Sequence, residues 1–156
     1  MLHNNTTAPD FSLPDEKGVI HTLQSYAGTW LVVYFYPKDD TPGCTTEACQ
    51  IGELYNSFSE LGVTVIGVSK DTSESHQKFK EKYKLPFTLL SDESAEMIRA
   101  YGALKEKVLL GIKSFSTSRV TYIINPEGIV VKAYDSVTPA EHAFELLKDL
   151  QTLQFK

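Results

Sequence analysis

Residues 30–36 read WLVVYFY, an unbroken apolar run that starts shortly after Gly28 and stops at Pro37. Such a run is typical of a strand that is buried on both faces of a parallel sheet. Residues 63–69 (VTVIGVS) have the same character, and residues 86–90 (PFTLL) are a shorter candidate. The run at 30–36 therefore predicts the centre of a sheet that has parallel neighbours.

Helical and hairpin patterns surround these strands. Apolar residues recur at helical spacing in four segments. The predicted helices are residues 45–61, 73–83, 94–101 and 139–150. Residues 120–124 and 129–134 flank Asn-Pro-Glu-Gly, which predicts a hairpin. Residues 103–118 show little periodicity and are interpreted as a loop. Because parallel strands need helical crossovers and a hairpin is antiparallel, we predict one α/β domain over residues 1–156. It is a thioredoxin-like fold in which helices flank a mixed central sheet.

Composition narrows the function classes. The 156 residues include 15 basic and 20 acidic side chains, and the formal net charge of -5 argues against a nucleic-acid or membrane partner. No apolar run is long enough to span a bilayer, and the N-terminus lacks the pattern of a signal peptide, so we expect a cytoplasmic protein. Two cysteines are too few for a cysteine-only zinc site, and no histidine lies beside them at ligand spacing. We therefore expect no metal, and the thiols are either inert or redox-active.

Cys44 lies between the strand at 30–36 and the helix at 45–61, where sites form in such sheets. A free cysteine is only about 3% thiolate at pH 7, and a helix N-terminus favours the thiolate. The alternative is a buried, inert cysteine. The polar lead-in PKDDTPG argues against that alternative, and the hydroxyl of Thr41 could hydrogen-bond a thiolate or a substrate oxygen. Lys38 could add positive charge only if it points inward.

Cys49 follows five residues later, which sets a geometric limit. In an α-helix this offset separates the two Cα atoms by roughly 8.6 Å. A disulfide needs roughly 4.4 to 6.8 Å. Two helical cysteines at this spacing either never pair or pair only when the helix opens locally, and a buried structural cysteine remains the alternative for Cys49.

The stretch YFYPKDDTPGCTTEAC resembles the active-site signature of peroxiredoxins, with P-x-x-x-T-x-x-C at Pro37, Thr41 and Cys44. The segments APDFSLPDEKG, VTVIGVSKDTSESHQKF, LPFTLLSD and RVTYIINPEG extend the likeness to the bacterioferritin comigratory protein or peroxiredoxin Q subfamily. The resemblance implies that Cys44 is the peroxidatic cysteine, that Thr41 and the Cys44 amide contact the peroxide, and that Pro37 shields the pocket.

The resemblance assigns three more residues. It implies that Arg119 stabilises the thiolate and the developing charge, that Glu47 organises the active-site turn, and that Cys49 resolves the oxidised Cys44. On sequence alone Arg119 could be a surface residue, and Glu47 could simply favour the first helical turn. None of the four histidines matches a catalytic position, so they are interpreted as surface residues: His3, His21, His76 and His142.

The implied activity is reduction of hydrogen peroxide and organic hydroperoxides by a monomer that needs no metal, haem or flavin and is recycled by thioredoxin or a similar dithiol. Ile51-Gly52 and the segment KEKVLLGIKSFSTSR depart from the family pattern. Gly52 should weaken its helix and could ease opening. The alternatives are a thiol–disulfide oxidoreductase, disfavoured because four residues separate the cysteines, and a slow redox sensor, which the sequence does not exclude.

Overall fold

The computed structural model describes residues 1–155. Its strands are β1 (Thr6–Thr7), β2 (Ser12–Pro14), β3 (Ile20–Thr22), β4 (Trp30–Phe35), β5 (Val63–Ser69), β6 (Thr88–Ser91), β7 (Leu104–Leu109), β8 (Ile112–Thr117), β9 (Val120–Ile124) and β10 (Ile129–Tyr134). Its helices are α1 (Pro42–Glu53), α2 (Tyr55–Glu60), α3 (Ser73–Tyr83), α4 (Glu96–Ala100) and α5 (His142–Gln154), with a short 3-10 helix at Leu23–Tyr26.

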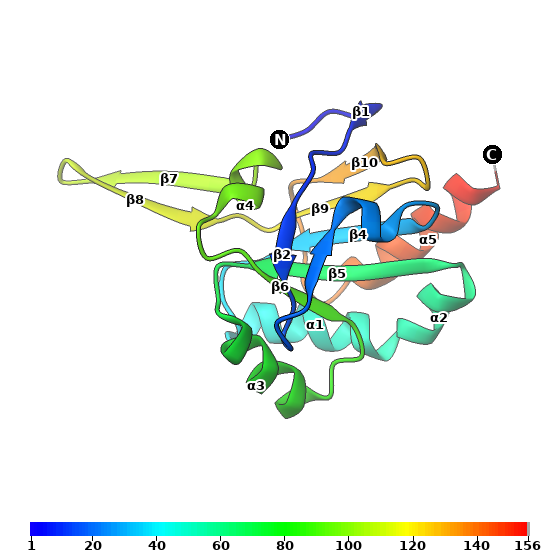
Figure 1. Ribbon diagram of the computed structural model, residues 1–156, viewed down its shortest axis with the longest axis horizontal. Coiled ribbons are helices and arrows are strands. Elements are labelled where there is room, and N and C mark those ends of the chain that lie inside the picture. The colour runs from blue at the N-terminus through cyan, green and yellow to red at the C-terminus, as the bar shows by residue number, and fades with distance from the viewer. Residues whose placement is uncertain (156) are drawn as a thin grey trace.

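The central sheet has six strands in the order β1-β10-β9-β4-β5-β6 (Figure 1). β4 lies at its middle and pairs in parallel with β5 and antiparallel with β9, while β5 continues in parallel to β6. β9 and β10 form the expected hairpin. The mixed sheet flanked by helices confirms the predicted thioredoxin-like fold.

Alternation along β4 divides the core into two layers, because successive side chains of a strand point to opposite faces. Val32 and Tyr34 pack on one face with residues of α1, α3 and α5. Leu31, Val33 and Phe35 pack on the other face with α4 and the N-terminal segment. Burial on both faces explains why the run at 30–36 is continuously apolar.

Two predicted elements were wrong. Residues 103–118 are not a loop, because β7 and β8 pair as an antiparallel hairpin that projects from the body of the molecule (Figure 1). Most of its side chains face solvent on both sides, so no apolar alternation marks the strands. The predicted helix at 45–61 is instead two helices that meet at Leu54, and α1 begins three residues earlier than expected, at Pro42.

The other boundaries shift by a few residues. The last helix begins at His142 rather than at Pro139, and α4 covers only part of the predicted 94–101. No helix among residues 1–155 is long and apolar enough to cross a membrane.

Candidate active site

The start of α1 positions Cys44. Thr41 is the N-cap residue in an extended conformation, and Pro42 occupies the first helical position, where its fixed φ suits a helix and its missing N–H costs nothing. Cys44 is therefore the third residue of the helix. The first amides of a helix have no hydrogen-bond partner within it. The N–H groups of Gly43 and Cys44 can therefore donate hydrogen bonds to a negatively charged atom. The predicted placement of Cys44 at a helix start is confirmed.

A guanidinium and a carboxylate complete the surroundings of the thiol. Nη2 of Arg119 lies 3.1 Å from Sγ of Cys44, and its Nη1 lies 3.3 Å from Oε1 of Glu47. Cys44 is only 1% exposed, as an inert core thiol would be, but the guanidinium of Arg119 contacts its sulfur, and a neighbouring cation is typical of reactive cysteines. The structure thus brings Cys44, Glu47 and Arg119 together, whereas Lys38 is exposed and has no ion pair among residues 1–155.

Gly43 is a site residue that the sequence indicated only as part of a turn. A Cβ atom at this position would lie 2.7 Å from Nη2 of Arg119, closer than real Cβ contacts allow. Glycine therefore leaves the space in which the guanidinium reaches the sulfur. Its proximity to the signature cysteine was the only available hint, since the close approach comes from a residue 76 positions away.

Thr41 and Pro37 border the site, but among residues 1–155 neither forms a hydrogen bond with the sulfur of Cys44. The Thr41 hydroxyl donates a hydrogen bond to the carbonyl of Lys38 at 2.8 Å. Its hydrogen is therefore engaged, while its oxygen can still accept a hydrogen bond. This geometry favours Thr41 as an acceptor for a substrate O–H rather than as a donor to the thiolate. Pro37 is exposed directly after β4 and Tyr36, and its shielding role stays a prediction.

A buried polar network anchors the loop that leads to Cys44. Asp39 accepts from the Tyr36 hydroxyl at 2.5 Å and from the Ser75 hydroxyl at 2.8 Å, and it lies 2.7 Å from Nδ1 of His76. Nε2 of His76 lies 2.9 Å from the carbonyl of Leu90, which can only accept, so that nitrogen donates. The network ties the loop to α3 and β6.

This network corrects the interpretation of the histidines. His76 is fully buried and His142 is 1% exposed, so neither is a surface residue. Both ring nitrogens of His142 also have partners, Glu145 and Thr121. Sequence offered no signal, since each ring has a partner far along the chain, Asp39 for His76 and Thr121 for His142. One ligand atom each from Asp39, Asp71 and His76 cluster within 4.8 Å, but both nitrogens of His76 are already engaged within the protein.

Cys49 lies in α1 with Cys44, and both thiols are free. It is half-buried against the core layer that contains Cys44. Burial, reinforced by the negative charge of Glu53, raises the pKa of the Cys49 thiol. Since both residues are helical, the predicted Cα separation of roughly 8.6 Å applies, and α1 must open before the sulfurs can bond.

Glu47 is buried almost completely. Burial raises the pKa of its carboxyl from 4.5 to about 7, against the opposing effect of the Arg119 charge and hydrogen bond. Its second oxygen, Oε2, has no hydrogen-bond partner among residues 1–155. The site therefore holds a carboxyl group that changes its charge near neutral pH.

We expect the Glu47 shift to make stability depend on pH. The folded protein keeps the proton up to about pH 7, whereas the unfolded chain releases it above 4.5, so the free energy of unfolding falls as pH rises through this window. Between about pH 5 and pH 8, the free energy of unfolding should decrease by about 2 to 3 kcal/mol less in Glu47→Gln than in the wild type. Urea unfolding at both pH values measures it, and Glu53→Gln, on the exposed side of α1, is the control. An equal pH dependence in wild type and Glu47→Gln would contradict the shift.

Comparisons with known proteins match nearly the whole chain. The AhpC/TSA family matches residues 5–133. The chain is 42% identical over 149 residues to peroxiredoxin Bcp of Bacillus subtilis, covering 96% of this chain and 95% of that protein. It is 42% identical to the chloroplastic peroxiredoxin Q of Sedum lineare, covering 96% and 78%. The structure of the Xanthomonas campestris bacterioferritin comigratory protein, studied for alkyl peroxide reduction, superposes with a TM-score of 0.88 at 39% identity, covering 92% and 91%.

Proposed function

The chain belongs to the AhpC/TSA family as a thiol peroxidase of the Bcp/PrxQ peroxiredoxins, and on this basis we propose that Cys44 attacks the peroxide and Cys49 resolves it. The observation that supports Cys44 most directly is the 3.1 Å contact between its sulfur and the guanidinium of Arg119. A permanent cation beside the sulfur and free amides at the start of α1 both favour the thiolate.

In the first step the Cys44 thiolate attacks the distal oxygen of a hydroperoxide. An S–O bond forms, the O–O bond breaks, and the leaving oxygen departs as water or an alcohol after taking a proton, so Cys44 becomes a sulfenic acid. Arg119 stabilises the charge that moves from sulfur to the leaving oxygen. Thr41 accepts a hydrogen bond from the substrate, while Glu47 orients the guanidinium through Nη1 and Pro37 limits access of water.

In the second step α1 opens, and the Cys49 thiol attacks the sulfenic acid, releasing water and forming an intramolecular disulfide. The raised pKa of Cys49 keeps it a thiol while the helix is intact. Opening removes the burial that raises its pKa, which favours the reactive thiolate at the moment when the sulfurs can meet. A dithiol reductant of the thioredoxin kind then exchanges its thiols for the disulfide.

The substrate range and setting extend this proposal. The Xanthomonas campestris relative was studied for alkyl peroxide reduction, which supports organic hydroperoxides beside hydrogen peroxide as substrates here. The proposed setting is a reducing compartment such as the cytoplasm, because the two free thiols must be regenerated at each cycle. Within this proposal the chain acts as a monomer. Its mechanism uses only side chains and backbone amides.

Stopped-flow oxidation of the reduced protein by hydrogen peroxide tests the function. We expect a second-order rate constant that exceeds that of free cysteine by several orders of magnitude, because the thiolate is preorganised beside Arg119. A rate near that of free cysteine would sink the assignment of Cys44 as a peroxidatic cysteine and favour a slow sensor. Catalysis of thiol–disulfide exchange without fast peroxide reduction would favour the oxidoreductase alternative.

A further inference from the structure

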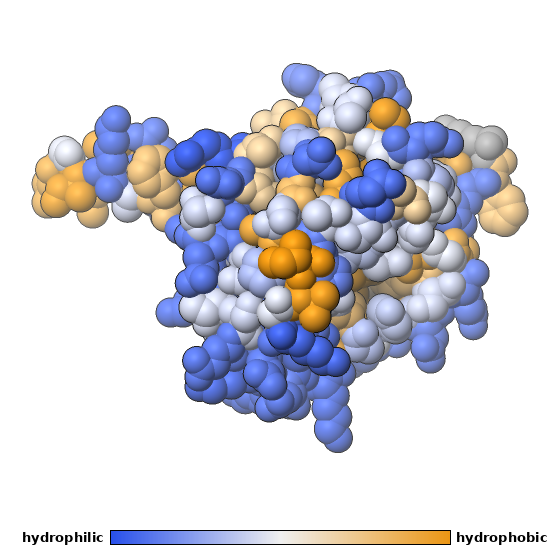
Figure 2. All heavy atoms as spheres, viewed as in Figure 1, coloured by the Kyte–Doolittle hydropathy of each residue, from blue (hydrophilic) through white to orange (hydrophobic). Residues whose placement is uncertain are grey.

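The β7–β8 hairpin has an exposed apolar tip. Figure 1 shows the hairpin extending away from the sheet, and Figure 2 shows hydrophobic side chains gathered at its end. The tip residues are among the most exposed large apolar residues of the described chain: Val108 (62%), Leu109 (75%), Leu110 (93%) and Ile112 (70%). They contribute nothing to either core layer, and contiguous exposed apolar residues of this kind mark an interaction site.

The turn itself is made by an unusual residue. Leu110 and Gly111 both have positive φ, at 53° and 77°, as in the tight turns that favour Asn-Gly. Leucine is disfavoured in the left-handed region and has no side-chain polar group to compensate. A strained leucine that is almost fully exposed does not serve the fold, so its apolar side chain is better explained by what it contacts outside the chain.

Positive charge lies directly behind the tip. On one face of the hairpin Lys105, Lys107 and Leu109 follow one another at alternate positions, and Leu109 is opposite Ile112. Strands β7 and β8 together carry three lysines and one glutamate, a local charge of +2 in a chain whose net charge is -5. Oε1 of the glutamate, Glu106, lies 3.6 Å from Nζ of Lys113 on the opposite face of the hairpin. Lys105 and Lys107 have no ion-pair partner among residues 1–155.

We propose that this hairpin docks on an anionic lipid bilayer. The apolar side chains of the tip would enter the boundary between headgroups and acyl chains, and Lys105 and Lys107 would meet the anionic headgroups. A convex tip suits a soft lipid surface better than a rigid partner, which would have to supply a matching recess. The unpaired edges of a two-stranded hairpin limit its depth to the interface, because unpaired backbone groups are excluded from hydrocarbon.

The expectation of no membrane partner rests on the net charge of the whole chain, whereas the proposed docking rests on the local charge and exposed apolar tip of this hairpin. The six residues of β8 lead from the tip to Ser118 and Arg119, a length of about 20 Å. Arg119 also lines a groove of about 440 Å³ together with Lys105, Lys107 and Ser116. Docking would therefore hold the Cys44 site close to a bilayer surface, and the docking itself does not depend on peroxidase activity.

Co-sedimentation with vesicles tests the proposal. We expect the 156-residue chain to bind vesicles of phosphatidylcholine and phosphatidylserine but not vesicles of phosphatidylcholine alone, and to lose binding as salt rises. The double substitution Leu109→Thr and Leu110→Asn should weaken binding about tenfold or more. It gives the hairpin a β-branched strand residue and an Asn-Gly turn, so it should fold at least as well as wild type.

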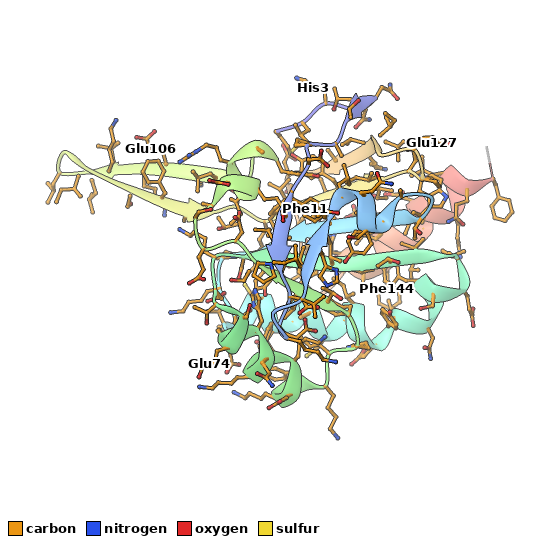
Figure 3. The ribbon with its side chains drawn as sticks, viewed as in Figure 1. His3, Phe11, Glu74, Glu106, Glu127 and Phe144 are labelled. Carbon is orange, nitrogen blue, oxygen red and sulfur yellow. The ribbon has the colours of Figure 1, made fainter. Side chains whose placement is uncertain are left out.

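Phe144 provides the matched control. It is 59% exposed on α5 and lies away from the hairpin, which carries the labelled Glu106 (Figure 3). Phe144→Gln removes an exposed apolar side chain elsewhere and should leave vesicle binding unchanged. Equal binding by the hairpin variant and wild type, or no binding by wild type, would overturn the proposal.

The same variants separate docking from two other outcomes. A dimer of the free protein that the hairpin substitutions dissolve, measured by light scattering, would assign the tip to a second copy and overturn the lipid assignment. The rate of Cys44 oxidation by hydrogen peroxide should be equal in the wild type and the hairpin variant. Slow oxidation of Cys44 in both the wild type and the hairpin variant would contradict the proposed function. The vesicle experiment would still test the docking proposal, because binding does not depend on peroxidase activity.

Discussion

Replacing Arg119 with Met should slow oxidation of Cys44 by hydrogen peroxide about a hundredfold to a thousandfold. The substitution removes the cation whose Nη2 lies 3.1 Å from the sulfur and leaves an unbranched apolar side chain in place of the aliphatic part of Arg119. The rate should fall because the sulfur loses its hydrogen-bond donor and the charge that develops on the peroxide oxygens loses the nearby cation. Stopped-flow fluorescence measures the rate.

Two further variants show whether geometry or charge carries the effect. Arg119→Lys keeps a positive charge but loses the fork that contacts Cys44 and Glu47 together, so its rate should lie between those of Met and wild type. Gly43→Ala keeps Arg119 and should still slow the reaction, because the added Cβ atom would lie 2.7 Å from Nη2. Gly52→Ala, in the same helix but facing Pro86, is the control. A wild-type rate in Arg119→Met would remove Arg119 from the site.

Replacing Cys49 with Ser should leave the first reaction with peroxide intact and stop turnover supported by thioredoxin. Cys49 does not contact the sulfur of Cys44 while α1 is folded, so the rate of the first step should not change. Without a second thiol the sulfenic acid at Cys44 cannot become an intramolecular disulfide, and the dithiol protein has no disulfide to reduce. Single-turnover stopped flow and a coupled thioredoxin assay measure the two steps.

A small thiol reductant provides the control for the Cys49 variant. Such a molecule can attack the sulfenic acid directly and should restore cycling, which would show that the variant is folded and oxidised normally. Mass spectrometry of the oxidised wild type should find an internal disulfide between Cys44 and Cys49. Continued turnover of Cys49→Ser with thioredoxin at the wild-type rate would show that another route resolves Cys44.

Local patterns in the chain were sufficient for the centre of the fold. The apolar run at 30–36, the second run at 63–69 and the Asn-Pro-Glu-Gly turn predicted β4, β5 and the β9–β10 hairpin, since each depends on neighbouring residues. The hairpin at 104–117 was missed because neither of its faces is buried and its turn is Leu-Gly. Solvent on both sides leaves no alternation to detect.

Spacing along the chain was enough to place one thiol at a helix start and to show that a helical Cys49 cannot reach it. Both statements need only helix geometry and the order of neighbouring residues. The three-dimensional structure was needed to show that Arg119 contacts that thiol, that Gly43 leaves room for the contact, and that His76 is buried against Asp39. These contacts join residues 37 to 76 positions apart, and folding brings such residues together through packing that no local pattern records.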